Sequence, residues 1–372
     1  MDYIRSFLGT TAFVLAVVLA FILHTLIHRQ SPRPRPRPLN SSPLTLLPPE
    51  IIQHIASFLR PSAAASFAST CLFVRLTMGT PYLRALRASR IESFELLGLL
   101  LADAPNDPAT NLPSRLICAH CRRLIPLYRG CGDSATPACR EAWDLSRKYI
   151  ESSFLPPVFH TAMAMHRQGR PSDALLAHIT PTTSTSYHSD NWITSQHRAR
   201  YHIATTGSLL LRRQITCILP YLVDGSNHRL HTQFCRHIGG QTKLISDAVS
   251  LVQSEARRGT RRSLSEFYLC IRCHTVVLLG ARKFRGRGIG LFVTWWRDLG
   301  DGWANDEKWE KLTRPALTAQ SGTRVKVTYN YMDVIKAFEE GNSDYIDFDG
   351  VWSPTDRKEL LRLSPYKIGA GK

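Results

Sequence analysis

Nine cysteines, irregularly spaced along a chain of 372 residues, are the side chains best suited to chemistry. An odd number without a regular framework argues against a secreted domain held by disulfides, and favours reduced thiols or metal ligation. Two pairs have the Cys-x2-Cys spacing that lets two thiolates reach one ion: Cys118 with Cys121, and Cys270 with Cys273. A closed structural zinc site needs four ligands, so each pair must be joined by two more.

Three ligand sets are compatible with the spacing. The first adds Cys131 and Cys139 to the first pair, in the pattern C-x2-C-x9-C-x7-C. The second adds Cys235 and His237 to the second pair. The third joins the two Cys-x2-Cys pairs to each other, and His228 is a further donor that belongs to no particular set.

Spacing alone does not choose among these sets, and His231 adds one more donor. Cysteines packed as small hydrophobic side chains are the alternative to any metal. We therefore treat six residues as candidate ligands of a structural zinc: Cys118, Cys121, Cys235, His237, Cys270 and Cys273.

Catalysis has no comparable signal in the sequence. It contains neither an HExxH zinc-protease motif, nor a P-loop, nor a G-x-S-x-G elbow. Gly286-Arg287-Gly288-Ile289-Gly290 leads into residues 291–296, which read as extended, whereas a dinucleotide-binding fingerprint requires a helix there. We interpret it as a glycine-rich turn and expect no enzyme.

Phe7–Ile27 is a long apolar segment with no formally charged residue. It would place the rest of the chain relative to a membrane. A helix of this length spans roughly 30 Å, the thickness of a bilayer core. The apolar run exceeds the 7–15 residues typical of a signal peptide, so residues 1–28 are predicted to be a single-pass anchor. Arginines at 29, 33, 35 and 37 follow it, which places the remainder in the cytosol by the positive-inside rule.

Residues 29–43 form a linker in which proline alternates with arginine from Pro32 to Pro38. Alternate prolines forbid a helix and favour an extended polyproline II spacer.

Residues 44–86 show the spacing of three short amphipathic helices. Pro48-Pro49 opens the first, whose apolar residues recur at positions 51, 52, 55, 58 and 59. Pro61 is expected to stop it, and Ser62 to cap a second helix over residues 63–71. A third segment ends at Gly79. Such a unit makes a poor core of its own and leaves an apolar face for a partner.

This segment resembles the F-box, through Leu47-Pro48-x-Glu50-Ile51-Ile52, then Ile55, Leu59, Phe67-Ala68 and Thr70-Cys71. The resemblance implies docking on the Skp adaptor of a cullin–RING ubiquitin ligase. The implied adaptor-binding residues are Leu47, Pro48, Glu50, Ile51, Ile52, Ile55, Phe58, Leu59, Phe67 and Cys71. The Ala/Ser-rich second helix, and Phe73-Val74 in place of a tryptophan, depart from the family pattern.

The remainder is similar to filamentous-fungal F-box proteins of uncharacterised specificity. The similarity rests on Cys118-x2-Cys121, Cys235-x-His237, Cys270-x2-Cys273 and Trp296-Arg297-Asp298-Leu299-Gly300. It implies a non-catalytic subunit that presents a protein substrate for ubiquitylation.

We expect an α+β fold in which residues 87–113 are a helix and linker and residues 114–372 an irregular C-terminal domain. Helices are predicted at 82–101, 155–167, 243–256 and 331–339, and a polar loop at 180–189. Strands are predicted at 208–219, 266–279, 291–296 and 324–329.

The net charge of +18 and the pI near 9.8 favour acidic partners. An alternative function is therefore a membrane-tethered basic domain, stabilised by zinc, that contacts anionic lipid or nucleic acid. The basic clusters near Arg257 and Arg282 have only Phe284 interleaved with them, which argues against nucleic acid.

Overall fold

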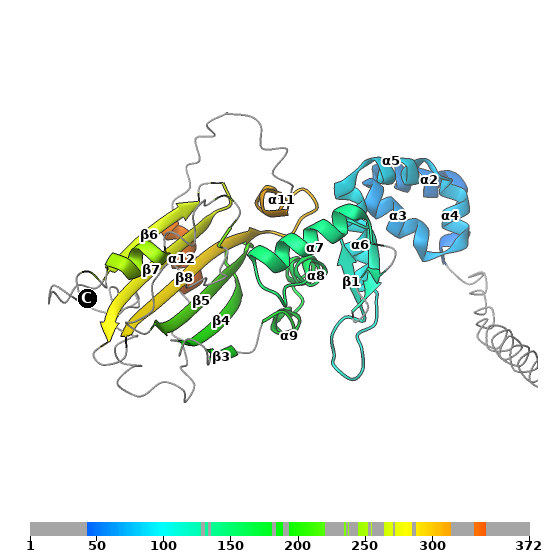
Figure 1. Ribbon diagram of the computed structural model, residues 1–372. Coiled ribbons are helices and arrows are strands. Elements are labelled where there is room, and N and C mark those ends of the chain that lie inside the picture. Colours follow the sequence, from blue (N-terminus) through cyan, green and yellow to red (C-terminus); the bar gives the residue numbers. More distant parts are fainter. Residues whose placement is uncertain are drawn as a thin grey trace, which may run out of the picture. The chain divides into compact units, whose positions relative to one another are not determined.

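The computed structural model describes residues 43–127, 131–132, 135–180, 184–188, 193–219, 234–235, 237, 245–251, 254, 264–270, 272–284, 288–313 and 331–339. The chain divides into two compact units, Met1–Arg84 and Ala85–Lys372. Figure 1 shows the helices of the first unit in blue and the sheet of the second in green to yellow. The predicted anchor at Phe7–Ile27 and the Pro32–Pro38 spacer lie outside the described residues. Along the described residues, no helix combines the length and hydrophobicity needed to cross a membrane.

Three short α-helices follow a 3-10 turn in the first unit. The turn is η1 (Pro43–Leu46), and the helices are α2 (Pro49–Phe58), α3 (Pro61–Thr70) and α4 (Leu72–Met78). A proline begins both α2 and α3, where no backbone N–H is needed. The expectation that Ser62 caps the second helix was wrong: Pro61 is its first residue, and Ser62 is a buried residue inside it.

The core of this unit is made mostly of small side chains. α4 packs against both α2 and α3. The buried apolar side chains of the unit are Ile52, Ala64, Ala65, Ala68 and Val74. Alanines bury little apolar area, so this core supplies modest hydrophobic stabilisation.

The helix predicted over residues 82–101 is two helices, α5 (Pro81–Ala88) and α6 (Arg90–Ala102). Ser89 separates them, with an extended backbone, and its hydroxyl accepts a hydrogen bond from the Glu92 backbone N–H at 3.2 Å. Serine followed three positions later by glutamate is the sequence signal of a capping box, which the apolar periodicity concealed.

The second unit contains a six-stranded antiparallel sheet in the order β3-β4-β5-β8-β7-β6. Its strands are β3 (Ser184–His188), β4 (Ile193–Ile203), β5 (Leu209–Leu219), β6 (Leu264–Cys270), β7 (Thr275–Phe284) and β8 (Gly288–Gly300). A separate two-stranded sheet pairs β1 (Arg115–Cys118) with β2 (Arg123–Pro126).

Helices cover the larger sheet, and every residue of its strand β8 is buried. On one face, Trp295 packs in a cluster with Ile245 and Val249 from the helical segment 245–251. On the other, Trp296 packs with Val334 and Phe338 of α12 (Tyr331–Glu339) (Figure 1). Burial on both faces explains why β8 reads as a continuous apolar run.

The remaining helices are α7 (Pro137–Tyr149), α8 (Pro156–Arg167), α9 (Asp173–Ala177) and α11 (Glu307–Thr313). Phe159 of α8 and Trp309 of α11 pack with ring centroids 4.9 Å apart and ring planes tilted by 41°. Both belong to the largest core cluster, which also includes Phe94 and Leu101 of α6.

The expectation of a mixed helix and strand fold is confirmed, with several corrections to its elements. The predicted loop at 180–189 contains strand β3, and the strand predicted at 266–279 is two strands joined by a tight turn. The prediction of α8 was confirmed to within one residue and that of α12 to the residue, whereas the strand predicted at 324–329 lies outside the described residues.

Gly302 follows β8 and allows a close approach that a side chain would prevent. Its φ is +73°, and a Cβ there would lie 2.7 Å from Met163 Cβ. Its carbonyl accepts a hydrogen bond from His160 Nδ1 at 3.0 Å. We expect Gly302→Ala to lower the free energy of unfolding by about 3 kcal/mol, the sum of a left-handed backbone and an overpacked core. Chemical denaturation measures this.

Gly207→Ala is the matched control, because Gly207 has a similar φ of +80° but no atom within 4 Å of the added Cβ. It should cost only about 1 kcal/mol. Equal losses in the two variants would contradict the role assigned to the Gly302–Met163 contact.

Candidate metal centres

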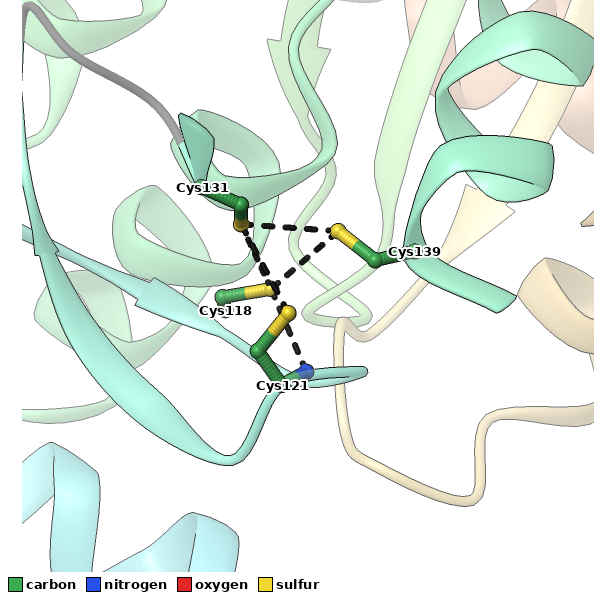
Figure 2. A group of neighbouring side chains, drawn as sticks. All are labelled: Cys118, Cys121, Cys131 and Cys139. Atoms are coloured by element: carbon green, nitrogen blue, oxygen red, sulfur yellow. Dashed lines mark hydrogen bonds between the residues drawn. The ribbon is translucent and has the colours of Figure 1, made fainter. Parts of the chain in front are cut away.

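The first cluster of ligands joins a β-hairpin to the start of a helix. Cys118 is the last residue of β1, and Cys121 lies in the turn to β2. Cys131 precedes α7, and Cys139 lies in the first turn of that helix. Figure 2 shows the four sulfur atoms turned toward one another. All four lie within 4.8 Å of each other.

The spacing of these sulfur atoms fits a single tetrahedral ion. The Sγ–Sγ distances are 3.7 Å for Cys118–Cys139 and Cys121–Cys131, 3.4 Å for Cys139–Cys131 and 3.3 Å for Cys131–Cys118. Zinc–sulfur bonds of about 2.3 Å arranged tetrahedrally give edges of about 3.8 Å. The distances exceed the roughly 2.05 Å of a disulfide, and all nine cysteines are free.

Local hydrogen bonds hold these ligands in place. The Cys121 backbone N–H donates to Cys118 Sγ at 3.4 Å. Thr136 caps α7 by accepting from the Cys139 backbone N–H at 3.2 Å. Arg123 donates to the Cys131 carbonyl at 3.2 Å. The helix start also places the positive end of its dipole beside the cluster, which favours negative charge on the group of sulfur atoms as a whole.

Protons are shared unevenly among these thiols. Hydrogen bonding with Cys139 lowers the pKa of Cys118 to about 5. Burial raises the pKa of Cys131 to about 12, and the hydrogen bond that Cys139 makes with Cys118 raises the pKa of Cys139 as well. Once one thiol ionises, its neighbours are held protonated, because a buried group of like charges is unfavourable. A cation shared among them removes that penalty.

The second cluster joins the β6–β7 turn to a segment between β5 and β6. Cys270 ends β6 and Cys273 lies in the turn, while Cys235 and His237 come from the preceding connection. Their ligand atoms also lie within 4.8 Å of one another, and the three cysteines are buried. Hydrogen bonds with Cys270 and Cys273 raise the pKa of His237 to about 9. Hydrogen bonds from Cys235 and Cys270 lower the pKa of Cys273.

The two clusters are built on the same local geometry. In each, the first cysteine of a Cys-x2-Cys pair ends a strand and the second lies in a hairpin turn. The residue after the second cysteine has a left-handed backbone in both, with φ of 50° at Arg122 and 48° at His274. Non-glycine residues adopt this conformation infrequently, so its recurrence marks a turn shaped to converge two sulfur atoms.

The structure distinguishes among the ligand sets that the spacing left open. It forms the first and the second set and does not join the two Cys-x2-Cys pairs. All six candidate ligands therefore belong to a cluster, and Cys131 and Cys139 complete the first. His228 and His231 lie outside the described residues.

The predicted adaptor-binding residues lie in and around α2 and α3. Pro48, Glu50, Ile51, Ile55 and Phe58 are exposed. Four more are half-buried: Leu47, Leu59, Phe67 and Cys71. The prediction was wrong for Ile52. Its side chain is fully buried in the first unit, so it packs on its own chain and is not part of an exposed face.

Comparison with protein families, with curated proteins and with solved structures gives no match.

Two metal ions per chain are expected to copurify with the protein, one for each cluster. Cys139→Ala should lower the count to one, because three remaining ligands leave the first site open. Elemental analysis of the purified chain measures the stoichiometry.

Cys217→Ala is the control, since Cys217 is fully buried in β5 but belongs to neither cluster. It should retain both ions and cost about 1 kcal/mol of stability through lost packing. Two ions retained in Cys139→Ala would contradict the assignment of the first cluster.

Proposed function

We propose that this protein is an F-box subunit of a Skp–cullin ubiquitin ligase, in which the first unit binds the Skp adaptor and the second presents a protein substrate. The observation that carries the proposal is an exposed apolar stripe on α2. Ile51, Ile55 and Phe58 are 45%, 38% and 76% exposed. Their spacing of four and three residues places them on one side of the helix.

The stripe is separate from the unit's own core. Ile52 is fully buried, whereas its neighbour Ile51 is exposed. Leu46, Leu72 and Leu76 add further exposed apolar side chains to the same unit. A group of exposed apolar side chains on one helix face, such as the α2 stripe, is a common feature of an interaction surface. An adaptor that covers it would supply the apolar burial that the small core lacks.

We propose zinc as the ion in both clusters. Four thiolates, or three with an imidazole, form closed sets that suit zinc in a reduced compartment. Iron–sulfur clusters spread their cysteines over several metal atoms. The sulfur atoms of the first cluster are close enough to surround one ion. Zinc would act structurally, because no ligand position is left open for water or substrate.

The chain itself would form and break no bonds. Its contribution would be proximity, which raises the effective concentration of a substrate lysine near a charged ubiquitin-conjugating enzyme. Phe7–Ile27 would tether the assembly to a membrane and hold both units in the cytosol, so the substrates would be proteins at or near that membrane.

We expect the full chain to bind a purified Skp adaptor, and Ile51→Asp combined with Ile55→Asp to weaken binding at least about 100-fold. Two carboxylates would then be desolvated in an apolar interface, which is costly without partners. Affinity measurement by calorimetry or by pull-down at graded adaptor concentrations tests this.

Ile91→Asp combined with Leu99→Asp is the matched control. These α6 residues are 43% and 37% exposed but belong to the second unit. The control should bind the adaptor like the unmodified chain, and both double variants should keep their metal. Failure of the unmodified chain to bind, or full binding by the α2 variant, would contradict the proposal. Salt-sensitive binding to anionic vesicles without the adaptor would favour the alternative of a basic lipid-binding domain.

A further inference from the structure

Arg297 is a charged side chain in the interior of the second unit. It lies in the fully buried strand β8 and is 1% exposed. Its guanidinium donates three hydrogen bonds: Nε to Thr275 Oγ1 at 2.8 Å, Nη1 to the Tyr149 carbonyl at 2.7 Å, and Nη2 to the Phe234 carbonyl. All three acceptors are uncharged.

A buried guanidinium with only neutral acceptors needs a counter-charge. The neighbouring carboxylates of the described chain are already engaged. Glu151 pairs with Arg213 at 2.8 Å, and Asp298 pairs with Lys308. Within that part of the chain, no ion pair to Arg297 is formed.

With zinc bound as proposed, the second cluster would supply the missing charge. Three thiolates and a neutral imidazole around a divalent cation carry a net charge of −1. The first cluster, with four thiolates, would carry −2, but none of the three acceptors of Arg297 is a neighbour in sequence of one of its ligands. Each cluster has three buried ligands and one half-buried ligand, so the contacts of Arg297, and not burial, single out the second.

The contacts of Arg297 also lead directly to two of the ligands. Phe234, which accepts one hydrogen bond, immediately precedes Cys235. Thr275, which accepts another, places its hydroxyl 3.2 Å from Cys273 Sγ and donates to the Cys273 carbonyl at 3.3 Å. One guanidinium therefore fixes both segments that must converge on the ion. Groups that orient ligands in this way tune metal affinity.

We propose that Arg297 is a positioning residue of the second metal centre, which aligns the segments bearing Cys235 and Cys273 and offsets the negative charge of the three thiolates. This rests on the proposed zinc occupancy of that centre. It does not depend on adaptor binding.

Arg297→Met and Arg297→Lys separate the two roles. Methionine removes both charge and hydrogen bonds, while lysine keeps the charge and loses the planar fork. On the full chain, competition with a chromogenic chelator should show one of two zinc ions held 10- to 100-fold more weakly in Arg297→Met, and by a smaller factor in Arg297→Lys. The other ion should be held as before.

Arg212→Met is the control. Arg212 is equally buried, at 3% exposed, on the adjacent strand β5, but it pairs with Glu339 at 2.9 Å. Its removal should lower stability and leave both zinc affinities unchanged. Replacing zinc with cobalt adds a spectroscopic measurement. The absorption bands of a cobalt centre would not change if Arg297 had only a general role in stability. Absorption bands of the three-sulfur centre should shift in Arg297→Lys, and those of the four-sulfur centre should not.

Unchanged affinity for both ions in the Arg297 variants, with two ions bound by the unmodified chain, would overturn this inference alone. If the unmodified chain bound no zinc at the second cluster, both this inference and the proposed zinc would fail. Should Arg297→Met not fold, Arg297→Lys decides, and equal weakening in Arg212→Met would count against a specific role.

Discussion

Four metal-ligating side chains packed within a few ångströms are unfavourable unless they share a cation, and the second unit contains two such groups of side chains. The two clusters are connected through one helix. Cys139, in the first turn of α7, belongs to the first cluster, and the carbonyl of Tyr149, its last residue, accepts a hydrogen bond from Arg297. A helix of this length spans roughly 20 Å. α7 thus links the β1–β2 hairpin at one end to the central strand of the sheet at the other, and its placement depends on both.

The first unit solves a different problem. Its interior is filled by alanines, with Ile52 and Val74 as the larger members, while bulkier apolar side chains such as Phe58 face outward. A helix whose large apolar residues face away from the core buries little apolar area within its own unit. Its stability then depends on other packing contacts. Because its large apolar side chains are exposed, the unit has a small core of its own. The same side chains can be buried when a partner binds, which would stabilise the unit.

Local signals in the sequence predicted some elements well. Paired prolines marked the start of α8, and the cysteine spacing included the two ligand sets that the fold assembles. The break at Ser89 could have been predicted from its glutamate three residues on, but the apolar period runs through it. The turn within residues 266–279 was missed because Cys270 and Cys273 are themselves apolar enough to continue a strand pattern. Strand β4 was not predicted because polar and charged residues occupy much of its length and give no apolar strand pattern.

No local rule could have anticipated Arg297. An arginine after two tryptophans reads as a surface charge at a strand end, and its burial follows only from the pairing of β8 between β5 and β7. The choice between ligand sets was likewise a matter of tertiary structure, because the sequence separation of Cys235 from Cys270 carries no information about which chain segments meet.

The two centres also differ in how much of the chain must exist before each can close. All ligands of the first cluster fall between Cys118 and Cys139, so the whole ligand set has been synthesised before any strand of the six-stranded sheet. The second needs Cys235, the β6–β7 turn and then Arg297, which is made last. The proposed zinc of the second cluster would therefore bind only after most of the strands of the sheet have been synthesised.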